Sequence, residues 1–261
     1  MNVLFTGAVG GIASNTINEL LKDNKNTIYL TVRTDNQVKI ANERFKNNKN
    51  VKCFKIDITN EKDRKLAEKL DIDVLINNAA ICYGGSIAEI PFDKVRENFE
   101  VNVFSSFEMV QLILKQMIKK GKGRIIMIAS LAGIIPIKFL GVYSATKSSI
   151  ITLTYTLKKE LKLLNDNIKV ILIEPGFYHT GFNQVMLENK YDWMKNKSYF
   201  KNQINDIRKK ENLMLSLLEK RNLKSITDKI IEAITSDKPK FIYRAPISQV
   251  IGAKIYQIFK K

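Results

Sequence analysis

The chain has 261 residues, of which 45% are hydrophobic and 26% charged, a balance typical of a globular protein that buries a full core. No stretch approaches the roughly 20 apolar residues that a membrane span needs, and no basic segment leads into an apolar one, so we expect a cytoplasmic protein without a signal peptide. Two cysteines and one histidine argue against a disulfide framework, a Ser-His-Asp triad or a multi-histidine site, and we expect no metal.

The net charge of +17 is the feature that suggests a nucleic-acid partner. Only 8 of the 43 basic residues are arginine, the residue that makes bidentate contacts to bases, and the basic residues are spread along the whole chain. We therefore expect a solvated, lysine-rich surface and no nucleic-acid partner.

Short β-branched runs alternate with amphipathic stretches along the chain. In chain order, the runs predict strands over 2–6, 27–33, 51–56, 73–77, 124–129, 168–174 and 240–244. The stretches between them predict helices over 12–24, 35–48, 60–70, 92–119, 142–165 and 225–236, with Asp35 and Asn60 as N-caps. This alternation predicts a single α/β domain over 1–261, with a doubly wound parallel sheet and helices on both faces.

Two segments depart from this rhythm. Residues 177–224 hold many aromatic and methionine side chains among lysines, and such an insertion after the sixth strand would lie beyond the carboxyl ends of the strands as a substrate lid. A pair of helices that simply packs on the core would have the same composition. The tail over 241–261 predicts a basic amphipathic helix, with Ile251, Ile255 and Ile258 on one face beside Lys254, Lys260 and Lys261.

A glycine-rich turn between the first strand and the first helix predicts a site for a pyrophosphate. Gly7 permits a tight turn and Gly11 a close backbone approach, while the helix that begins near Gly10 and Ile12 points its N–H groups at an anion. Alone, this pattern is also that of an ordinary βα turn.

Polar residues at the ends of later strands support a nucleotide. Asp57 and Ile58 follow the third strand, and Asn78 and Ala79 follow the fourth, although asparagines there also serve as turn residues. Arg33 lies at the tip of the second strand, where a guanidinium favours the 2′-phosphate of NADP over the free hydroxyl of NAD. The sequence thus predicts NADP(H) as cofactor, with NAD(H) possible because Asp35 lies two residues on.

The catalytic groups are predicted from the spacing of Ser130, Tyr143 and Lys147. Tyr143 and Lys147 lie four residues apart on one helix, so their side chains share a face. An ammonium about 4 Å from a phenolate stabilises it by about 4 kcal/mol at an effective dielectric near 20, so we expect the pKa of Tyr143 to fall by about three units. Ser130 ends the fifth strand, where it would hold a substrate oxygen or merely cap the strand.

Six pieces in order along residues 2–180 resemble the short-chain dehydrogenase/reductase family, of the Rossmann type. They are Thr6-Gly7-x-x-x-Gly11-x-Ala13, Asn77-Asn78-Ala79-Ala80, Asn102, Ser130, Tyr143-x-x-x-Lys147 and Pro175-Gly176-x-x-x-Thr180. Ala13 and Ala80 replace glycines of the family pattern, and both are small enough to leave it intact.

The resemblance implies roles for the remaining residues. Asn102 would hold a water that links Lys147 to solvent, while Pro175, Gly176, the backbone near Phe177 and the Thr180 hydroxyl would bracket the nicotinamide amide. Hydride would pass between the nicotinamide and a carbonyl carbon, with Tyr143 as proton donor or acceptor. We therefore expect an oxidoreductase that acts on a carbonyl or secondary-alcohol substrate.

The substrate and partners follow from weaker signals. The composition of 177–224 suggests a bulky apolar substrate, either steroid-like, retinoid-like or fatty-acyl. We also expect a homo-oligomer, and the tail can contact an anionic membrane, pack on its own domain or pack on a partner subunit. The alternative function is a non-catalytic regulator that binds NAD(P)(H) and senses redox state, although such a protein has no need of a proton path.

Overall fold

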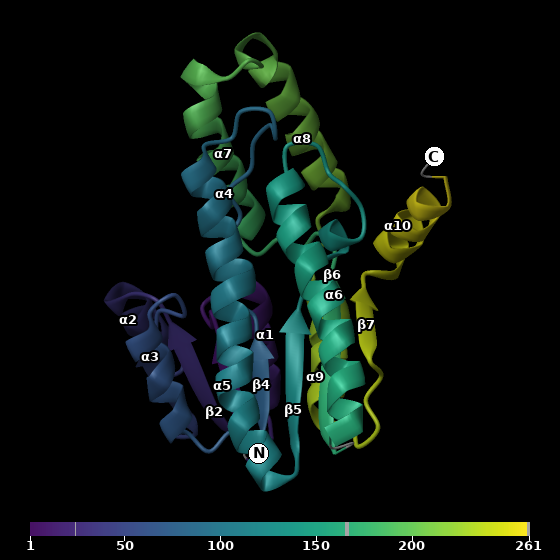
Figure 1. Ribbon diagram of the computed structural model, residues 1–261. Helices are drawn as coiled ribbons and strands as arrows, with labels where there is room; N and C mark the ends of the chain where they lie inside the picture. Colours follow the sequence, from purple (N-terminus) through teal and green to yellow (C-terminus); the bar gives the residue numbers. More distant parts are fainter. Residues whose placement is uncertain (24, 165–166, 260–261) are drawn as a thin grey trace.

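The computed structural model describes residues 1–23, 25–164 and 167–259 and contains one parallel sheet of seven strands in the order β3-β2-β1-β4-β5-β6-β7 (Figure 1). The strands are β1 (Asn2–Thr6), β2 (Thr27–Val32), β3 (Val51–Lys55), β4 (Val74–Asn77), β5 (Gly123–Ile128), β6 (Ile168–Pro175) and β7 (Ile242–Ala245). The order reverses between β1 and β4, which makes the sheet doubly wound and confirms the predicted fold class.

Helices cover both faces of the sheet. On one face lie α1 (Gly11–Leu20), α2 (Asp35–Arg44) and α9 (Lys224–Thr235), and on the other lie α3 (Glu61–Leu66), α5 (Ser105–Lys120) and α6 (Gly141–Leu164). Beyond the carboxyl ends of the strands lie α4 (Phe92–Phe99), α7 (Phe182–Lys197), α8 (Ile204–Leu218) and α10 (Ile247–Phe259) (Figure 1). The extra helices are therefore placed at the edge where the strands end.

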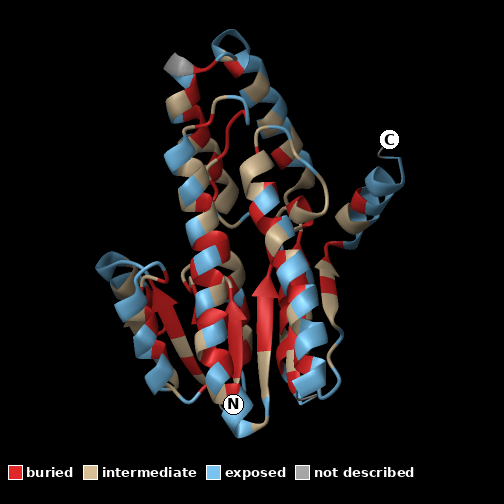
Figure 2. Ribbon diagram, in the orientation of Figure 1, coloured by how far each residue is buried: buried red, intermediate tan, exposed pale blue. Residues whose placement is uncertain are grey.

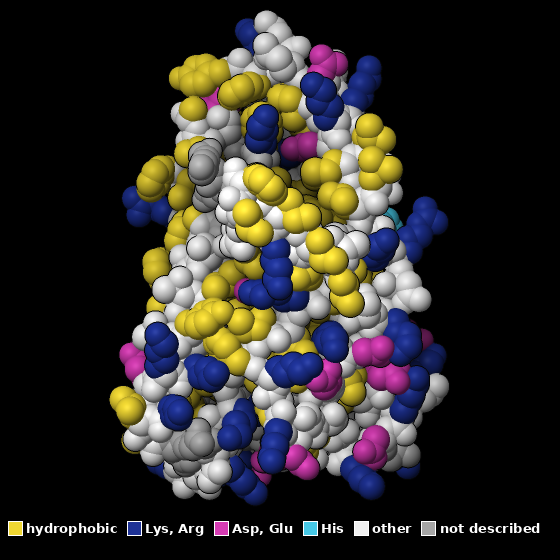
Figure 3. Space-filling model, turned by 90° about the vertical axis from the view of Figure 1, so that its right-hand side faces the viewer, with side chains coloured by type: hydrophobic (Ala, Val, Ile, Leu, Met, Phe, Trp, Pro, Cys, Tyr) yellow, Lys and Arg dark blue, Asp and Glu magenta, His cyan; other side chains and the backbone are white. Residues whose placement is uncertain are grey.

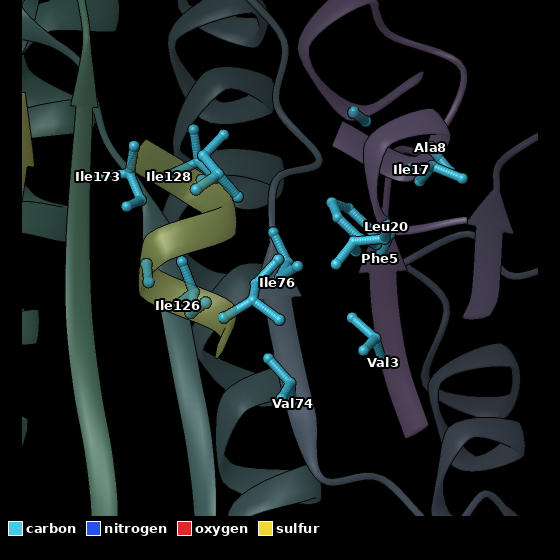
Figure 4. Close-up of a cluster of buried hydrophobic side chains, with 14 of the residues drawn as sticks. Val3, Phe5, Ala8, Ile17, Leu20, Val74, Ile76, Ile126, Ile128 and Ile173 are labelled. Atoms are coloured by element: carbon cyan, nitrogen blue, oxygen red, sulfur yellow. The ribbon is translucent and has the colours of Figure 1, made fainter. Parts of the chain in front are cut away.

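Alternate residues of each central strand fill the cores on the two faces. Ile126 and Ile128 of β5 belong to the cluster under α1 and α9, whereas Ile125 and Met127 belong to the cluster under α5 and α6. Figure 4 shows the first cluster, in which side chains of four neighbouring strands lie in a continuous layer. The central strands are buried along most of their length while the outer helix faces are exposed (Figure 2), as expected for a sheet covered on both sides.

The sequence located the elements correctly, with differences at their ends. Asn60 is the N-cap of α3, as predicted, because its side chain accepts hydrogen bonds from the Lys62 and Asp63 N–H groups. The predicted cap at Asp35 is wrong: Thr34 caps α2 in a capping box with Gln37, and Asp35 is the first helical residue. The predicted helix over 92–119 is interrupted at Glu100–Phe104 by a π-helical turn, which separates α4 from α5.

The segment over 177–224 forms two helices, α7 and α8, which lie beyond the carboxyl ends of the strands (Figure 1). We call this segment the lid. The predicted tail helix is present as α10, and Ile251, Ile255 and Ile258 are all exposed on it, while Lys260 and Lys261 fall outside the described residues. Among the helices that the structure describes, none is long and apolar enough to cross a bilayer.

Arg124 at the start of β5 ties the sheet to α9. Its guanidinium donates to the carbonyl oxygens of Ala233 at 2.6 Å and Ser236 at 2.8 Å, and also to that of Ile234, at the carboxyl end of α9. The terminal carbonyls of a helix have no donor within the helix. The Arg124 guanidinium supplies donors to them, and its positive charge also interacts favourably with the helix dipole.

We expect Arg124→Met to lower the free energy of unfolding by about 2 kcal/mol, because half-buried carbonyls lose their donors. Arg124→Lys, which keeps a charge but not the fork of donors, should lose less. Urea unfolding followed by the fluorescence of Trp193, the single tryptophan, measures both. Equal stability of Arg124→Met and the unaltered chain would show that solvent replaces the guanidinium at no cost.

Candidate active site

A cavity of about 360 Å³ opens where the carboxyl ends of the strands meet the lid. Every residue predicted for the site lines it except Asn102. The lining residues that the sequence predicted are Gly7, Gly10, Gly11, Ile12, Arg33, Asp57, Ile58, Asn78, Ala79, Ser130, Tyr143, Lys147, Pro175, Gly176 and Thr180. The topology therefore brings Gly7 and Thr180, which lie far apart in the chain, to one cleft.

The Thr6 hydroxyl holds the glycine turn against the end of β4. Its oxygen accepts from the N–H groups of Asn78 at 2.9 Å and Ala79 at 3.0 Å, and its hydrogen goes to Asn77 Oδ1 at 3.3 Å. In return, the Asn78 amide donates to the carbonyls of Thr6 and Gly7. Gly7 has φ of +65° and a Cβ there would lie 2.8 Å from Ala79 Cα, so glycine is required. The sequence motif predicted this turn, but not that Thr6 organises it.

The first turn of α1 offers its N–H groups to the cavity. The N-cap is Gly10, which brings no side chain to accept from them, and the first turn contains no acidic residue. A Cβ on Gly11 would lie 2.9 Å from Thr180 Cβ, so this glycine allows the start of the lid to approach α1. An anion placed here would meet unpaired donors and the positive end of the helix dipole.

Of the charged residues at the ends of β2 and β3, some face the cavity and others are paired with one another. The Arg33 side chain is exposed on the cavity wall, whereas Lys55 Nζ pairs with Asp35 Oδ2 at 2.7 Å. The hydrogen bond and charge of Lys55 hold the pKa of Asp35 below its ordinary value. Asp57 Oδ1 accepts from the Thr59 N–H at 2.9 Å and from its hydroxyl at 2.8 Å, which leaves the second carboxylate oxygen for a ligand.

Ser130, Tyr143 and Lys147 come together on the wall formed by β5 and α6. Lys147 is buried and donates from Nζ to the Ile128 carbonyl at 2.9 Å, and its Nζ lies 5.7 Å from the centroid of the Tyr143 ring. Ser130 Oγ donates to the Pro175 carbonyl at 3.4 Å and accepts from the Ala132 N–H at 3.1 Å, so it caps the strand end, and its hydroxyl acts to lower the pKa of the Tyr143 phenol. A hydroxyl, a phenol and an ammonium group thus face one cavity.

The predicted fall in the pKa of Tyr143 is wrong for this chain. Burial raises the pKa of the phenol well above its ordinary value, a nearby Cys82 thiol acts in the same direction, and the hydrogen bond with Ser130 opposes them. Burial also lowers the pKa of Lys147 to about 8. The sequence-based expectation assumed a dielectric near that of the surface, whereas desolvation dominates at this buried pair.

Asn102 lies behind the site, in the π-helical turn between α4 and α5. Its amide exchanges hydrogen bonds with the backbone of Ile81, at 2.8 and 2.9 Å, and donates to Thr146 Oγ1 at 3.1 Å. Thr146 in turn donates to the Tyr143 carbonyl at 2.7 Å. Asn102 therefore connects the segment after β4 to the helix that carries Tyr143, and π turns of this kind are frequent at functional sites. Its role in holding a water stays a prediction.

The sequence predicted apolar lining from 177–224, which includes Phe182 and Met186, but it did not single out Cys82 or Leu140. Cys82, Leu140 and Met186 form a buried cluster beside Tyr143, and the Phe182 ring lies 5.8 Å from the Tyr143 ring. All four residues line the cavity. The position of Phe182, two residues after Thr180, was the available signal. Tyr191, Trp193 and Phe200 of the lid form a separate cluster with Phe139, whereas Phe177 and Tyr178 line the cavity and Tyr199 is exposed.

The base of the lid is paired to itself. Phe177 and His179 exchange backbone hydrogen bonds with Lys220, and His179 Nδ1 lies 2.8 Å from Glu219 Oε2. The Phe177 N–H donates to Gln249 Oε1 of α10 at 2.7 Å. The backbone near Phe177 was expected to be a partner of the nicotinamide amide, and in this structure the Phe177 N–H is bonded within the chain.

The fold, the glycine turn and the Ser-Tyr-Lys wall define a class. The chain belongs to the short-chain dehydrogenase/reductase family, since the family model for short chain dehydrogenases matches residues 1–190. It is 30% identical over 213 residues to a probable short-chain type dehydrogenase/reductase, VdlC, from Helicobacter pylori, covering 79% of this chain and 76% of that protein.

Two further similarities extend over most of the chain. It is 28% identical over 248 residues to an NADPH-dependent 3-dehydrocapnine reductase from Ornithobacterium rhinotracheale, covering 88% of this chain and 83% of that one. Its fold matches a short-chain dehydrogenase/reductase from Burkholderia phymatum, solved in complex with NAD, with a TM-score of 0.83 and 19% identity over 98% of this chain and 92% of that one.

Lys147 gives the site a measurable dependence on pH. Its pKa is about 8 in the folded chain and near 10.5 when unfolded, so between these values the unfolded state binds more protons. Stability from this group therefore rises with pH over that window, by about 3 kcal/mol in all, and the cost of the buried charge is fully present below pH 8.

We expect Lys147→Met to remove this rise, so that its stability relative to the unaltered chain falls between pH 8 and 10.5. Urea unfolding at several pH values measures the difference. Lys159→Met, on the exposed side of the same helix, is the matched control and should leave the slope unchanged. Parallel pH profiles for Lys147→Met and the unaltered chain would contradict the burial of a charged lysine.

Proposed function

We propose that the chain is an NADP(H)-dependent carbonyl reductase and alcohol dehydrogenase of the EC 1.1.1 type. The observation that carries this proposal is that one cavity joins the uncapped first turn of α1 to the wall of Ser130, Tyr143 and Lys147. An anion site and a proton donor at opposite ends of a cleft suit a dinucleotide with its reactive ring beside a carbonyl substrate.

The residues of the cavity fit a nicotinamide dinucleotide. The glycine turn leaves room for a pyrophosphate because nothing but the Gly7 carbonyl, at 3.7 Å, lies near a Cβ built on Gly10. Asn78 and Ala79 line the path across the sheet, and Pro175, Gly176 and Thr180 line the end beside Tyr143. A bound nicotinamide would supply hydride to a carbonyl carbon, or accept it from an alcohol.

The protonation states of the chain favour reduction. Because burial raises the pKa of Tyr143, its phenol stays protonated at neutral pH and can give its proton to the carbonyl oxygen as the alcohol forms. Ser130 donates a hydrogen bond to the same oxygen. Lys147, cationic below about pH 8, stabilises the phenolate that is left and binds the ribose hydroxyls. In oxidation the same groups act in reverse.

A preference for NADP(H) is supported by the charges at the end of β2. Arg33 faces the cavity, and the carboxylate of Asp35, which would favour a ribose hydroxyl, is paired with Lys55. The relative from Ornithobacterium rhinotracheale is described as NADPH-dependent, whereas the Burkholderia phymatum structure holds NAD, so NAD(H) remains the second cofactor to test.

A bulky apolar substrate, steroid-like, retinoid-like or fatty-acyl, is supported by the lining beside Tyr143. Cys82, Leu140, Phe182 and Met186 present sulfur, aliphatic and aromatic surface there. Burial of an apolar substrate against this surface is favourable. A polar substrate group would lose its hydrogen bonds to water there without gaining new ones.

We also propose a cytoplasmic homo-oligomer with peripheral membrane contact through α10. Both cysteines are free thiols, in keeping with a reducing compartment. Phe92 and Phe104 are more than half exposed around α4, as is Ile258 on α10, and apolar surface of this extent favours association with a second copy or a lipid surface.

We expect Tyr143→Phe to lower kcat for ketone reduction by at least about 10²-fold while NADPH binding is retained, because only the transferable proton is lost. A panel from quinones to steroid ketones, followed by NADPH oxidation, provides the measurement. Tyr155→Phe, exposed on the same helix, is the control. Unchanged turnover in Tyr143→Phe would overturn the mechanism, and NADPH binding without turnover on any compound would favour a redox-sensing regulator.

We expect Arg33→Ala to raise KM for NADPH by about 10–100-fold, the value of one to two charge-assisted hydrogen bonds, with little effect on KM for NADH. Lys39→Ala, which removes an exposed charge from α2, is the control. Equal losses with both cofactors would show that Arg33 does not read the 2′-phosphate.

A further inference from the structure

Gln249, in the first turn of α10, makes one hydrogen bond to each end of the lid. Its Oε1 accepts from the Phe177 N–H at 2.7 Å, directly after β6, and its Nε2 donates to the Leu218 carbonyl at 2.7 Å, at the end of α8. One amide thus satisfies a backbone donor at the start of the lid and a helix-terminal acceptor at its end.

These two points are the two ends of the lid. Phe177 O accepts from the Lys220 N–H at 3.0 Å, and the His179 N–H donates to Lys220 O at 3.1 Å, so the chain entering the lid pairs with the chain leaving it. Gln249 adds a crosslink from outside this pair. The two ends of the lid are therefore joined by their own backbone hydrogen bonds, and Gln249 of α10 adds a side-chain link to each end.

The packing around Gly176 shows how closely Gln249 is fitted. A Cβ at position 176 would lie 2.1 Å from Gln249 Oε1 and 3.0 Å from Pro246 Cδ, so any larger residue there would displace the Gln249 amide from its present position. Gly176 also lines the cavity at the end where the nicotinamide is proposed to lie. The Gln249 side chain therefore contacts the Pro175–Phe177 segment, which also lines the cavity.

The rest of α10 is weakly attached. Of its described residues Ala253 alone is buried, and a Cβ on Gly252 would meet nothing within 4 Å. The helix projects from the body in Figure 1, and hydrophobic side chains gather on the face of the molecule that includes it in Figure 3. Gln249 is therefore a main polar link between this helix and the site.

We propose that Gln249 is a positioning residue: it holds the Pro175–Phe177 segment against the nicotinamide and keeps the lid closed at its base. The proposal rests on the function proposed above. Gln249 does not line the cavity and acts through the backbone of Phe177. Since the glycine turn and Arg33 lie at the other end of the cleft, losing Gln249 should disturb hydride transfer more than cofactor affinity.

The test compares Gln249→Met, which keeps the length of the side chain without its hydrogen bonds, with Gln257→Met, an exposed glutamine of the same helix. Gln249→Glu, which keeps the acceptor for Phe177, is the second variant should Gln249→Met fold poorly. Four quantities are measured: kcat for ketone reduction, Kd for NADPH, the thermal midpoint of unfolding, and the rate of limited trypsin cleavage within 177–224 without cofactor.

We expect Gln249→Met to lower kcat about tenfold, to change Kd for NADPH less than threefold, and to speed cleavage of the lid about tenfold, in line with the loss of two hydrogen bonds. Gln249→Glu should keep more of kcat, and Gln257→Met should match the unaltered chain. Unchanged kcat and unchanged cleavage in Gln249→Met would overturn the proposal. So would a parallel fall in kcat, affinity and thermal midpoint, which indicates general destabilisation.

Failure of the proposed function is recognised separately. If the unaltered chain neither binds nor oxidises NADPH, that function is wrong whatever the variants do. The cleavage experiment still judges the clamp at the base of the lid, because it needs no cofactor: faster cleavage in Gln249→Met supports the clamp, and equal cleavage overturns it.

Discussion

All seven strands run in one direction, and the arrangement of the whole molecule depends on this constraint. Both faces of the sheet are covered by helices, so polar groups at the strand ends can reach solvent or ligand only at the edges. At the carboxyl edge, Thr6 and Asn78 are therefore hydrogen-bonded to each other, and Asn78 and Ser130 line the cavity. The hydrophobic core determines where the chemistry is placed, and the loops supply its residues.

Burial shapes the electrostatics of the candidate site more than proximity does. Tyr143 and Lys147 share a helix face, yet desolvation raises the pKa of the phenol and lowers that of the ammonium, so both neutral forms are favoured. The pKa values of the pair therefore depend on the apolar surroundings of the site as well as on the four-residue spacing of the two side chains.

The sequence was informative wherever a residue type has one physical use at its position. A turn with positive φ favours glycine at position 7, a strand covered on both faces favours the apolar run that ends at Ile128, and a helix N-terminus favours Asn60. Local patterns of this kind were enough to predict the fold and most of the lining of the cleft. Long-range partners could not be predicted in this way. Asp35 pairs with Lys55, and Gln249 contacts Phe177, at sequence separations that no helix or strand periodicity predicts. The direction in which the pKa of Tyr143 shifts depends on burial, which results from such long-range packing.

The lid has a small core of its own, in which Tyr191, Met194 and Ile204 pack together while Lys190 and Tyr191 bond to Glu211 across α7 and α8. The side chains of this core come from α7, α8 and the loops beside them, so the two helices can be repacked without moving the strands that carry the glycine turn and Ser130.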